Sequence, residues 1–393
     1  MFDRLSDDVL RNPYPLYEQI RAGTPVVHDP RADLWMVFDY DGVKRVLMDH
    51  DAFSSRAAPP GGQPLDWLIF FDPPQHTKLR ALVTRAFTPR VVAGLETRIA
   101  QIVRELLDRV VVRGEMDVAA DLAVPLPLTV IAEMIGIPPE DRAQFRRWSD
   151  AVLRLSDTIA QPGEEAQRAV AAFRAATEEM RSYLVDLIAA RRRVPREDLL
   201  TRLVHAEVDG EGLTNEEVLR FFQLLLVAGS ETTTNLIGNA VVCFLELADA
   251  LARLRADPAL LPSAIEEILR YRSPVQAMFR QTRRDVRLHD VEIPAGKLVL
   301  AMIGAANRDP AVFREPGRFD LTRDPNPHLA FGHGIHFCIG APLARLEGRV
   351  ALAALLDRVT ALALGDDAPW EPRRAFHVHG PTRLRVRFEP RAV

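Results

Sequence analysis

Apolar residues recur at helical spacing through most of the chain between about Pro74 and Leu269. The clearest segments are TKLRALVTRAF, GLETRIAQIVRELLDRVV, LPLTVIAEMIG, EEAQRAVAAFRAATEEMRSYLVDLIAARRR and TNEEVLRFFQLLLVAGSETTTNLIGNAVVCFLEL. The last of them opens with a capping box, Thr214 and Glu217, and continues to Leu247. The pattern therefore predicts a chain dominated by α-helices.

Strand patterns are confined to short stretches. Near the N-terminus TPVVHDP and DLWMVFDY predict two strands, and a helix begins at Asp41–Leu47. Strand character returns between Met278 and Ile303, around a turn at residues 294–296, and a final hairpin is expected around HVHGPTRLRVRFEP. No internal repeat or long linker interrupts the chain. We therefore expect one large domain over residues 1–393, mainly α with minor β-sheets.

Composition narrows the class of protein. Hydrophobic residues make up 48% and charged residues 26% of the 393 residues, which is ordinary for a soluble protein. A formal net charge of -4 argues against a nucleic-acid binder. Cys243 and Cys338 are the two cysteines, so a disulfide framework is impossible. The N-terminus lacks a signal or anchor pattern, and polar residues interrupt the apolar run that begins at Phe221, so a soluble, cytoplasmic protein is expected, with no membrane contact.

The segment FGHGIHFCIG, from Phe331 to Gly340, carries the most specific chemistry. Its glycines, Gly332, Gly334 and Gly340, allow tight backbone curvature and the close approach of a flat ligand. Because the helical pattern APLARLEGRVALAALL follows at once, Cys338 is expected at a helix N-terminus. There the helix dipole favours a thiolate over a thiol.

Three interpretations of Cys338 compete. A lone cysteine is most often a small core hydrophobe. A zinc site of His333, His336 and Cys338 is a second possibility, although the usual paired ligand spacing is missing. The third is the axial thiolate of a haem, which the placement of the glycines favours.

A second unusual segment is AGSETTT, Ala228 to Thr234, in the middle of the long predicted helix. Glycine and β-branched threonines are weak helix formers. The segment could simply be a polar kink in which the threonine hydroxyls bond back to carbonyls of the preceding turn. Alternatively, the segment could form a groove for a small ligand, with an acid and a hydroxyl as a proton relay.

At this point the chain resembles a known family. The order Phe, two residues, Gly, any, His, any, Cys, any, Gly is the haem-binding signature of the cytochrome P-450 family, and FGHGIHFCIG matches every fixed position. The resemblance extends over almost the whole chain and implies the cytochrome P-450 fold. It also implies haem b with Cys338 as the axial thiolate, held in a loop that includes Phe331, Gly332 and Gly340.

The same resemblance assigns roles to the AGSETTT segment. The family motif is Ala, Gly, any, acid, Thr, which matches Ala228 to Thr232. Ala228 and Gly229 would lie against the haem. Thr232 would steady bound dioxygen, and Glu231 would supply protons, making these two the expected catalytic residues.

Haem propionates need cationic or hydrogen-bonding partners. His76 and Arg80 stand four apart and so share a helix face, although such a pair alone would suggest only a surface feature. In similar proteins the two bind propionate. The resemblance adds His336 and Arg280, the latter with Arg283 and Arg284 as nearby competitors.

Glu267 and Arg270 stand three apart in EEILR, which by itself predicts an exposed salt bridge. Glu266 offers a rival register. The resemblance implies the family's EXXR pair, buried and structural, and joined by an arginine of the PGRF segment, Arg318. AANRDP, residues 305–310, is expected to form structural turns in which Asn307 and Asp309 bond nearby backbone.

The implied activity is that of a bacterial-type monooxygenase that inserts one oxygen atom of dioxygen into an organic substrate. No flavin or iron–sulfur segment is recognisable, so a ferredoxin and its reductase are the expected electron donors. Rival functions are a peroxide-driven peroxygenase and a non-catalytic haem sensor or carrier. A small lipophilic substrate is expected, because the predicted pocket walls are largely apolar: residues 59–70, Leu224, Val227, Val275, Phe279 and the turn near Phe376.

Overall fold

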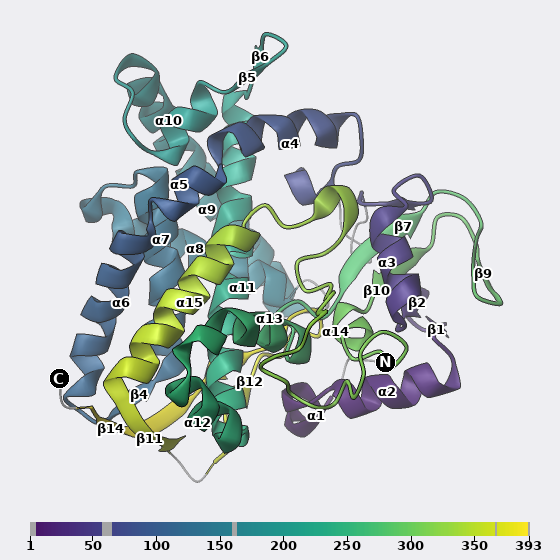
Figure 1. Cartoon of the computed structure of the whole chain (residues 1–393). Helices are drawn as coiled ribbons and strands as arrows, with labels where there is room; N and C mark the ends of the chain where they lie inside the picture. The colour runs from purple at the N-terminus through teal and green to yellow at the C-terminus, as the bar shows by residue number, and fades with distance from the viewer. Residues whose placement is uncertain (1–4, 57–64, 159–162, 366–367, 392–393) are drawn as a thin grey trace. The chain divides into compact units, whose positions relative to one another are not determined.

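A computed structural model describes residues 5–56, 65–158, 163–365 and 368–391 (Figure 1). These residues are mainly helical and form small sheets, as the sequence predicts. The chain divides into two compact units, residues 1–57, 96–126 and 232–393 in the first and residues 58–95 and 127–231 in the second. The boundary crosses one helix, α11 (Asn215–Glu246), between Glu231 and Thr232.

Helices of the first unit come from several parts of the chain. They are α1 (Asp7–Arg11), α2 (Tyr14–Gly23), α3 (Tyr40–Met48), α6 (Glu96–Val111), η2 (Ala119–Ala123), the C-terminal half of α11, α12 (Ala248–Ala256), η4 (Pro258–Leu260), α13 (Leu261–Tyr271), α14 (Ile303–Ala306), η5 (Gly334–His336) and α15 (Ala341–Arg358). In Figure 1, α15 runs beside α6, and the two helices pack against each other. The apolar core between α11, α13 and α15 includes Leu236, Phe244, Ile268 and Leu352.

The largest sheet also belongs to the first unit. Its strands are arranged in the order β1 (Val26–Asp29), β2 (Leu34–Val37), β10 (Leu298–Ala301), β7 (Met278–Thr282) and β3 (Phe53–Ser54). β10 pairs in parallel with β2 and antiparallel with β7, where Val299 stands opposite Arg280. The predicted N-terminal strands, the helix after them and the strand region from Met278 are all present, including a turn with Gly296 at φ +75°.

The expectation of a C-terminal hairpin is wrong. β13 (Pro381–Arg383) pairs with β12 (Glu371–Pro372), whereas β14 (Arg385–Pro390) pairs with β11 (Val359–Leu364) and β4 (Glu115–Asp117). Only Leu384 separates β13 from β14, which leaves no room for even a two-residue hairpin turn. The remaining pair of the first unit is β8 (Val286–Leu288) with β9 (Val291–Ile293).

The second unit is almost entirely helical. It contains η1 (Leu68–Phe70), α4 (Gln75–Ala86), α5 (Pro89–Ala93), most of α7 (Pro125–Ile135), η3 (Pro139–Asp141), α8 (Arg142–Thr158), α9 (Glu164–Arg193), α10 (Leu199–Val204), the short strands β5 (Glu207–Val208) and β6 (Glu211–Gly212), and the N-terminal half of α11. The predicted capping box starts α11, because Thr214 N–H donates to Glu217 at 2.8 Å and Glu217 N–H donates to the Thr214 hydroxyl at 3.2 Å.

Within the described ranges, no single helix is both long and apolar enough to cross a membrane. Helices α11 and α12 together are long and apolar enough to span a membrane by length and composition alone, but they are bent by 105° at the break between them.

Candidate functional site

The loop from Phe331 to Gly340 uses its glycines for backbone shape. Gly332 and Gly334 have φ angles of +74° and +73°, a region that side chains disfavour. A Cβ atom on Gly334 would also lie 3.2 Å from Cα of Met48, so the loop approaches the backbone of α3 closely. The loop is therefore shaped by positions that only glycine fills without strain.

Cys338 lies at the start of α15, as the sequence predicts. Its N–H donates to the Phe331 carbonyl at 2.9 Å, which closes the loop on itself. Gly340 caps α15 without a side-chain hydrogen bond, so the amides and dipole of this helix end favour a negative charge nearby. Cys243, by contrast, is fully buried, and burial raises the pKa of its thiol to about 11, which identifies it as a core residue.

The surroundings of Cys338 fit a haem better than zinc. Among the residues that the structure describes, no group of three or more histidine, cysteine or acidic side chains is placed to hold a metal ion. The zinc interpretation with His333 and His336 therefore has no structural support. The loop is only partly buried, and Phe337 is 44% exposed. A single thiol in a partly exposed loop is the donor set expected for the axial ligand of a haem.

The first unit also holds two of the predicted propionate partners. Arg280 lies on β7, where it is 3% exposed and donates to the Phe279 carbonyl at 2.7 Å. His336 lies in η5, with Nε2 2.9 Å from the Ser55 hydroxyl. Guanidinium and imidazole N–H groups are donors of the kind that a carboxylate accepts.

Two predicted pocket residues accompany them in the first unit. Val275 and Phe279 are both partly buried. Val275 forms an isolated β-bridge with Val378, and the ring of Phe279 meets Phe376 edge-on at 6.2 Å. The structure thus brings Phe279 and the turn near Phe376 together, as expected for one apolar wall.

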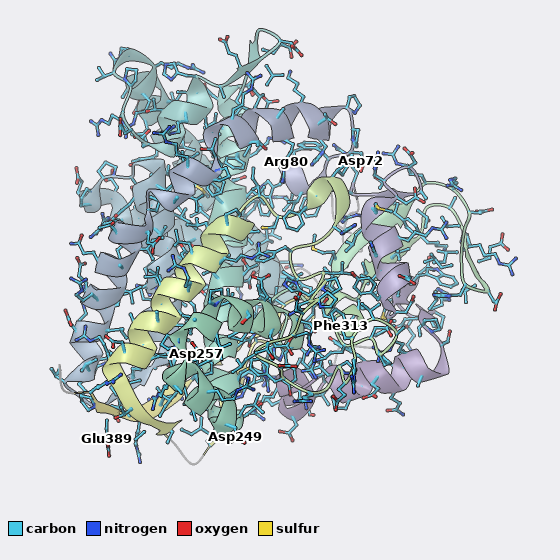
Figure 2. All side chains as sticks on the ribbon, viewed as in Figure 1. Asp72, Arg80, Asp249, Asp257, Phe313 and Glu389 are labelled. Carbon is cyan, nitrogen blue, oxygen red and sulfur yellow. The ribbon has the colours of Figure 1, made fainter. Side chains whose placement is uncertain are left out.

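The second unit carries the other two residues that the sequence predicts as propionate partners, His76 and Arg80. α4 bears His76, 3% exposed, and Arg80 one turn later; Figure 2 labels Arg80 on this helix. His76 N–H donates to the Asp72 carbonyl at the start of the helix.

The AGSETTT segment lies within an unbroken α11. Ala228 is exposed, whereas Leu224 and Glu231 are buried and Val227 and Thr232 are partly buried. A Cβ on Gly229 would lie 2.7 Å from Cδ1 of Ile131, so glycine permits close packing against α7. Exposed alanine in a mostly buried helix is consistent with a ligand surface at this point.

The hydroxyls of this segment do not act alike. Ser230 donates back to the Leu226 carbonyl of the preceding turn, although the simpler interpretation assigns such bonds to the threonines. Thr234 instead donates to the Ala123 carbonyl of η2 at 2.9 Å. Back-bonding to the preceding turn therefore accounts for Ser230 and not for Thr234.

The second unit contains a chain of two side-chain hydrogen bonds that was not predicted from the sequence. Trp67, of the expected pocket loop, donates through Nε1 to Gln223 at 3.3 Å, and Gln223 donates to Thr177 at 2.9 Å. The signal in the sequence was a glutamine inside an apolar helix face, at a position that is 4% exposed. Residues 59–64 of the expected loop lie outside the described residues.

Glu267 and Arg270 form a fully buried ion pair, and the third member is Arg323 rather than Arg318. Arg323 Nε lies 3.2 and 3.1 Å from the two carboxylate oxygens of Glu267. Arg318 contributes its backbone carbonyl, which accepts from Arg270 at 3.1 Å, while its side chain forms an exposed pair with Glu315. The prediction of Arg318 was wrong because the chain turns after Arg318 and brings the later arginine inward.

The expectation for AANRDP is only partly confirmed: Asp309 bonds the nearby backbone, whereas Asn307 bonds distant residues and Ala305 and Ala306 end α14. Asn307 donates to the Ser273 hydroxyl at 2.7 Å and accepts from Leu329 N–H at 2.7 Å. Asp309 accepts from the N–H groups of Tyr40 and Ala311 at 2.8 and 3.0 Å.

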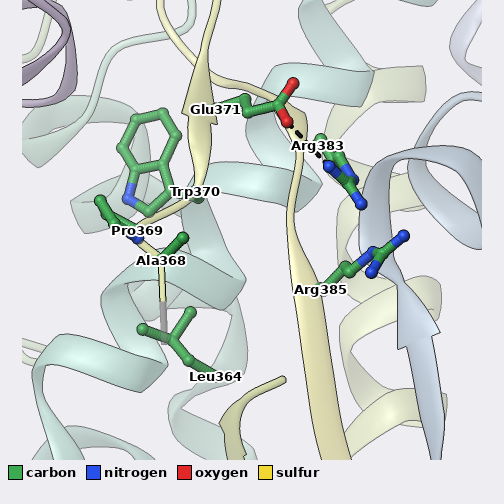
Figure 3. Close-up of a pocket in the computed structure, with 7 residues that line it drawn as sticks. All are labelled: Leu364, Ala368, Pro369, Trp370, Glu371, Arg383 and Arg385. Carbon is green, nitrogen blue, oxygen red and sulfur yellow. Dashed lines mark hydrogen bonds and ion pairs between the residues drawn. The ribbon is translucent and has the colours of Figure 1, made fainter. Parts of the chain in front are cut away.

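A small cavity in the first unit is separate from these residues. Its volume is about 50 Å³, enough for one or two water molecules but not for an organic substrate. Figure 3 shows its lining, in which Arg383 pairs with Glu371 at 2.9 Å: Leu364, Ala368, Pro369, Trp370, Glu371, Arg383 and Arg385. None of the predicted site residues is among them.

Comparison with known proteins settles the family. Residues 144–379 match the family model described as Cytochrome P450. Cytochrome P450 monooxygenase PikC of Streptomyces venezuelae is 44% identical, covering 93% of this chain and 88% of its own, and the vitamin D(3) 25-hydroxylase of Pseudonocardia autotrophica is 39% identical, covering 100% and 97%.

A solved structure shows the same fold. CYP109E1 from Bacillus megaterium, in complex with testosterone, is 40% identical with a TM-score of 0.88 and covers 96% of this chain and 99% of its own. The chain therefore belongs to the cytochrome P450 family of haem-thiolate monooxygenases, whose cofactor is haem b on a cysteine thiolate.

Proposed function

We propose that residues 1–393 form one monooxygenase domain in which Cys338 is the axial ligand of haem b. The observation that carries this assignment is the position of Cys338, in a glycine-shaped loop at the uncapped N-terminus of α15. When bound, the haem supplies the oxidising chemistry by which one atom of dioxygen enters the substrate. Phe331, Gly332 and Gly340 belong to the same loop and would line the cofactor.

His76, Arg80, Arg280 and His336 would hold the propionates. All four are side chains with N–H donors, and His76 and Arg280 are each 3% exposed. Guanidinium and imidazole N–H groups form strong charge-assisted hydrogen bonds with a carboxylate, which suits these side chains to a propionate. Ala228 and Gly229 would provide the small side chains that let a macrocycle approach α11.

Glu231 and Thr232 would move protons. They are consecutive on α11, with Glu231 4% exposed and Thr232 partly exposed. The Thr232 hydroxyl would hold a proton towards the reacting oxygen, and the Glu231 carboxyl would replace that proton from outside. This pair favours a monooxygenase over the peroxide-driven alternative, which needs no such delivery.

A ferredoxin with its reductase would supply the electrons. Support comes from membership of the cytochrome P450 family, which implies redox partners. The substrate would be a small lipophilic molecule. Support comes from the apolar residues Leu224, Val227, Val275 and Phe279, and from relatives named for vitamin D(3) hydroxylation and for a testosterone complex.

The assignment is tested by the absorption spectrum of the reduced carbonyl complex. Wild-type protein should show the strongly red-shifted Soret band of a thiolate-ligated haem, and Cys338→Ser should lose it, while Cys243→Ser should keep it. A wild-type band typical of histidine ligation would refute the role of Cys338. A screen of steroids, fatty acids and macrolides for the haem spin-state change would then identify the substrate class.

A further inference from the structure

The ring of Phe331 is held on several sides. The guanidinium of Arg345 lies 4.4 Å from the ring centroid, within range of a cation–π contact. The rings of His328 and Phe337 lie 6.1 and 6.3 Å away. Since the Phe331 carbonyl accepts the N–H of Cys338 at 2.9 Å, whatever fixes Phe331 also fixes the backbone of Cys338.

Arg345 is itself fixed by a fork of hydrogen bonds. Its Nε and Nη2 donate to the two carboxylate oxygens of Glu266 at 2.6 and 2.8 Å. His328 Nε2 lies 3.0 Å from the same carboxylate, and its side chain is 4% exposed. We call Glu266, His328 and Arg345 the Glu266 clamp; it joins α13, the segment before the Cys338 loop, and α15.

The electrostatics of the clamp favour a fixed geometry. Burial by itself would raise the pKa of Glu266, but hydrogen bonds from Arg345 and His328 outweigh it and lower that pKa to about 2. The carboxylate therefore stays charged at any working pH, and its bonds to Arg345 are charge-assisted and bidentate. The side chains of Arg345 and Glu266 are 38% and 31% exposed, so it is the bidentate geometry that distinguishes this pair from a flexible surface pair, which contributes little.

Glu266 and Glu267 are adjacent on α13 but bind different groups. Glu267 binds Arg270, Arg323, the backbone N–H of Asp320 and the side chain of Asn326. Glu266 binds His328 and Arg345, the side chains that contact the ring of Phe331. Both carboxylates therefore bind the segment before the Cys338 loop, and of the two it is Glu266 that fixes the side chains around Phe331.

We propose that Glu266, Arg345 and His328 are positioning residues for Cys338, which they hold in place through the ring and carbonyl of Phe331. This inference rests on the proposed role of Cys338 as the haem ligand. The clamp acts at a distance from the sulfur, so its loss should release the ligand loop before the rest of the protein unfolds.

The test compares two arginines of α15. Arg345→Lys keeps the charge but loses the fork and the flat stacking surface. Arg349→Lys is the matched control, because Arg349 lies one turn later and pairs with Glu96 of α6 at 2.8 Å with similar exposure. Holoprotein of each variant is titrated with urea, following the thiolate-type carbonyl Soret band and the far-ultraviolet circular dichroism in parallel.

In Arg345→Lys and in Glu266→Gln, we expect the thiolate band to disappear at a lower urea concentration than the helical circular dichroism signal. In Arg349→Lys the interval between the two transitions should match that of wild type. The Glu266→Gln/Arg345→Lys double variant should separate the transitions no further than either single variant, because both changes remove one unit.

The inference is overturned if Arg345→Lys and Arg349→Lys behave alike, or if the thiolate band is lost only together with the helical signal. It is also overturned if the double variant separates the two transitions by the sum of the separations seen in the single variants. A wild-type holoprotein without the thiolate band would instead refute the proposed role of Cys338, so the two failures are distinguishable.

Discussion

Arg270 donates two hydrogen bonds of 2.7 Å to Glu267, one turn earlier on α13, and neither side chain is exposed. Figure 2 labels Phe313, whose ring lies 5.3 Å from the same guanidinium. Arg270 also donates to the carbonyls of Asn307, Pro316 and Arg318. The pair thereby ties a helix to the long irregular segment that leads to the Cys338 loop.

Replacing Glu267 should destabilise the protein strongly. Glu267→Gln leaves the guanidinium of Arg270 buried without its counter-charge, which costs about 3 to 5 kcal/mol in free energy of unfolding. We expect a matching loss of haem incorporation in Glu267→Gln and in Glu267→Ala. Urea unfolding and the haem-to-protein ratio are the measurements; a holoprotein yield equal to wild type would contradict the prediction.

Replacing Arg323 should destabilise the protein much more than replacing Arg318. The side chain of Arg323 is 10% exposed and bonds both oxygens of Glu267, so Arg323→Ala should cost about 2 kcal/mol or more. Arg318→Ala removes only an exposed pair with Glu315 and should change the free energy of unfolding by less than about 0.5 kcal/mol. Equal costs for the two variants would show that the pairing in solution differs.

Gly334 should not tolerate a side chain. Its φ of +73° costs an L-residue about 1 to 2 kcal/mol, and a Cβ would press against Met48 at 3.2 Å. Gly334→Ala should therefore lower the free energy of unfolding and the fraction of haem with thiolate ligation. Gly317→Ala is the control, because no atom lies within 4 Å of its added Cβ. If both variants retain wild-type stability, the loop does not require glycine.

Replacing Thr232 should impair catalysis without impairing haem binding. Removing the hydroxyl in Thr232→Ala should reduce product formed per electron consumed by at least about tenfold, since positioned proton transfer contributes roughly 10²–10⁴-fold. Thr232→Ser keeps the hydroxyl and should restore most of this coupling. Substrate turnover with a surrogate ferredoxin is the assay, with the carbonyl spectrum as a check on integrity. Full coupling in Thr232→Ala would exclude the relay.

Glu347 on α15 should make stability depend on pH. Burial raises its pKa from 4.5 to about 8, with Thr233 offsetting only part of the effect. The folded protein holds the Glu347 proton more tightly than the unfolded chain does. The stabilisation that results is therefore complete below about pH 4.5 and is lost as the pH rises to about 8. The loss is about 1.4 kcal/mol per pH unit in that window.

In the Glu347→Gln variant, the free energy of unfolding should lack the part of its pH dependence that Glu347 causes. Urea midpoints measured from pH 5 to 8 should therefore fall less steeply in the variant than in wild type. Asp357→Asn, at an exposed position on the same helix, should retain the wild-type slope. Parallel curves for Glu347→Gln and wild type would exclude a protonated Glu347.

The sequence by itself determined the local features of this protein. The boundaries of α9 and α11, the capping box at Thr214 and the glycines around Cys338 all depend on interactions between residues a few positions apart. Such interactions are encoded in short patterns, so periodicity, capping residues and the signature FGHGIHFCIG were sufficient to predict them.

Only the tertiary structure decided which distant groups meet. Arg318 and Arg323 are only five residues apart, and the path of the loop after α14 selects Arg323 as the partner of Glu267. The same holds for β13 and β14, which join different sheets, and for Arg345, whose partner Glu266 is 79 residues away. These pairings depend on long-range packing and desolvation, for which no spacing in the sequence provides a signal.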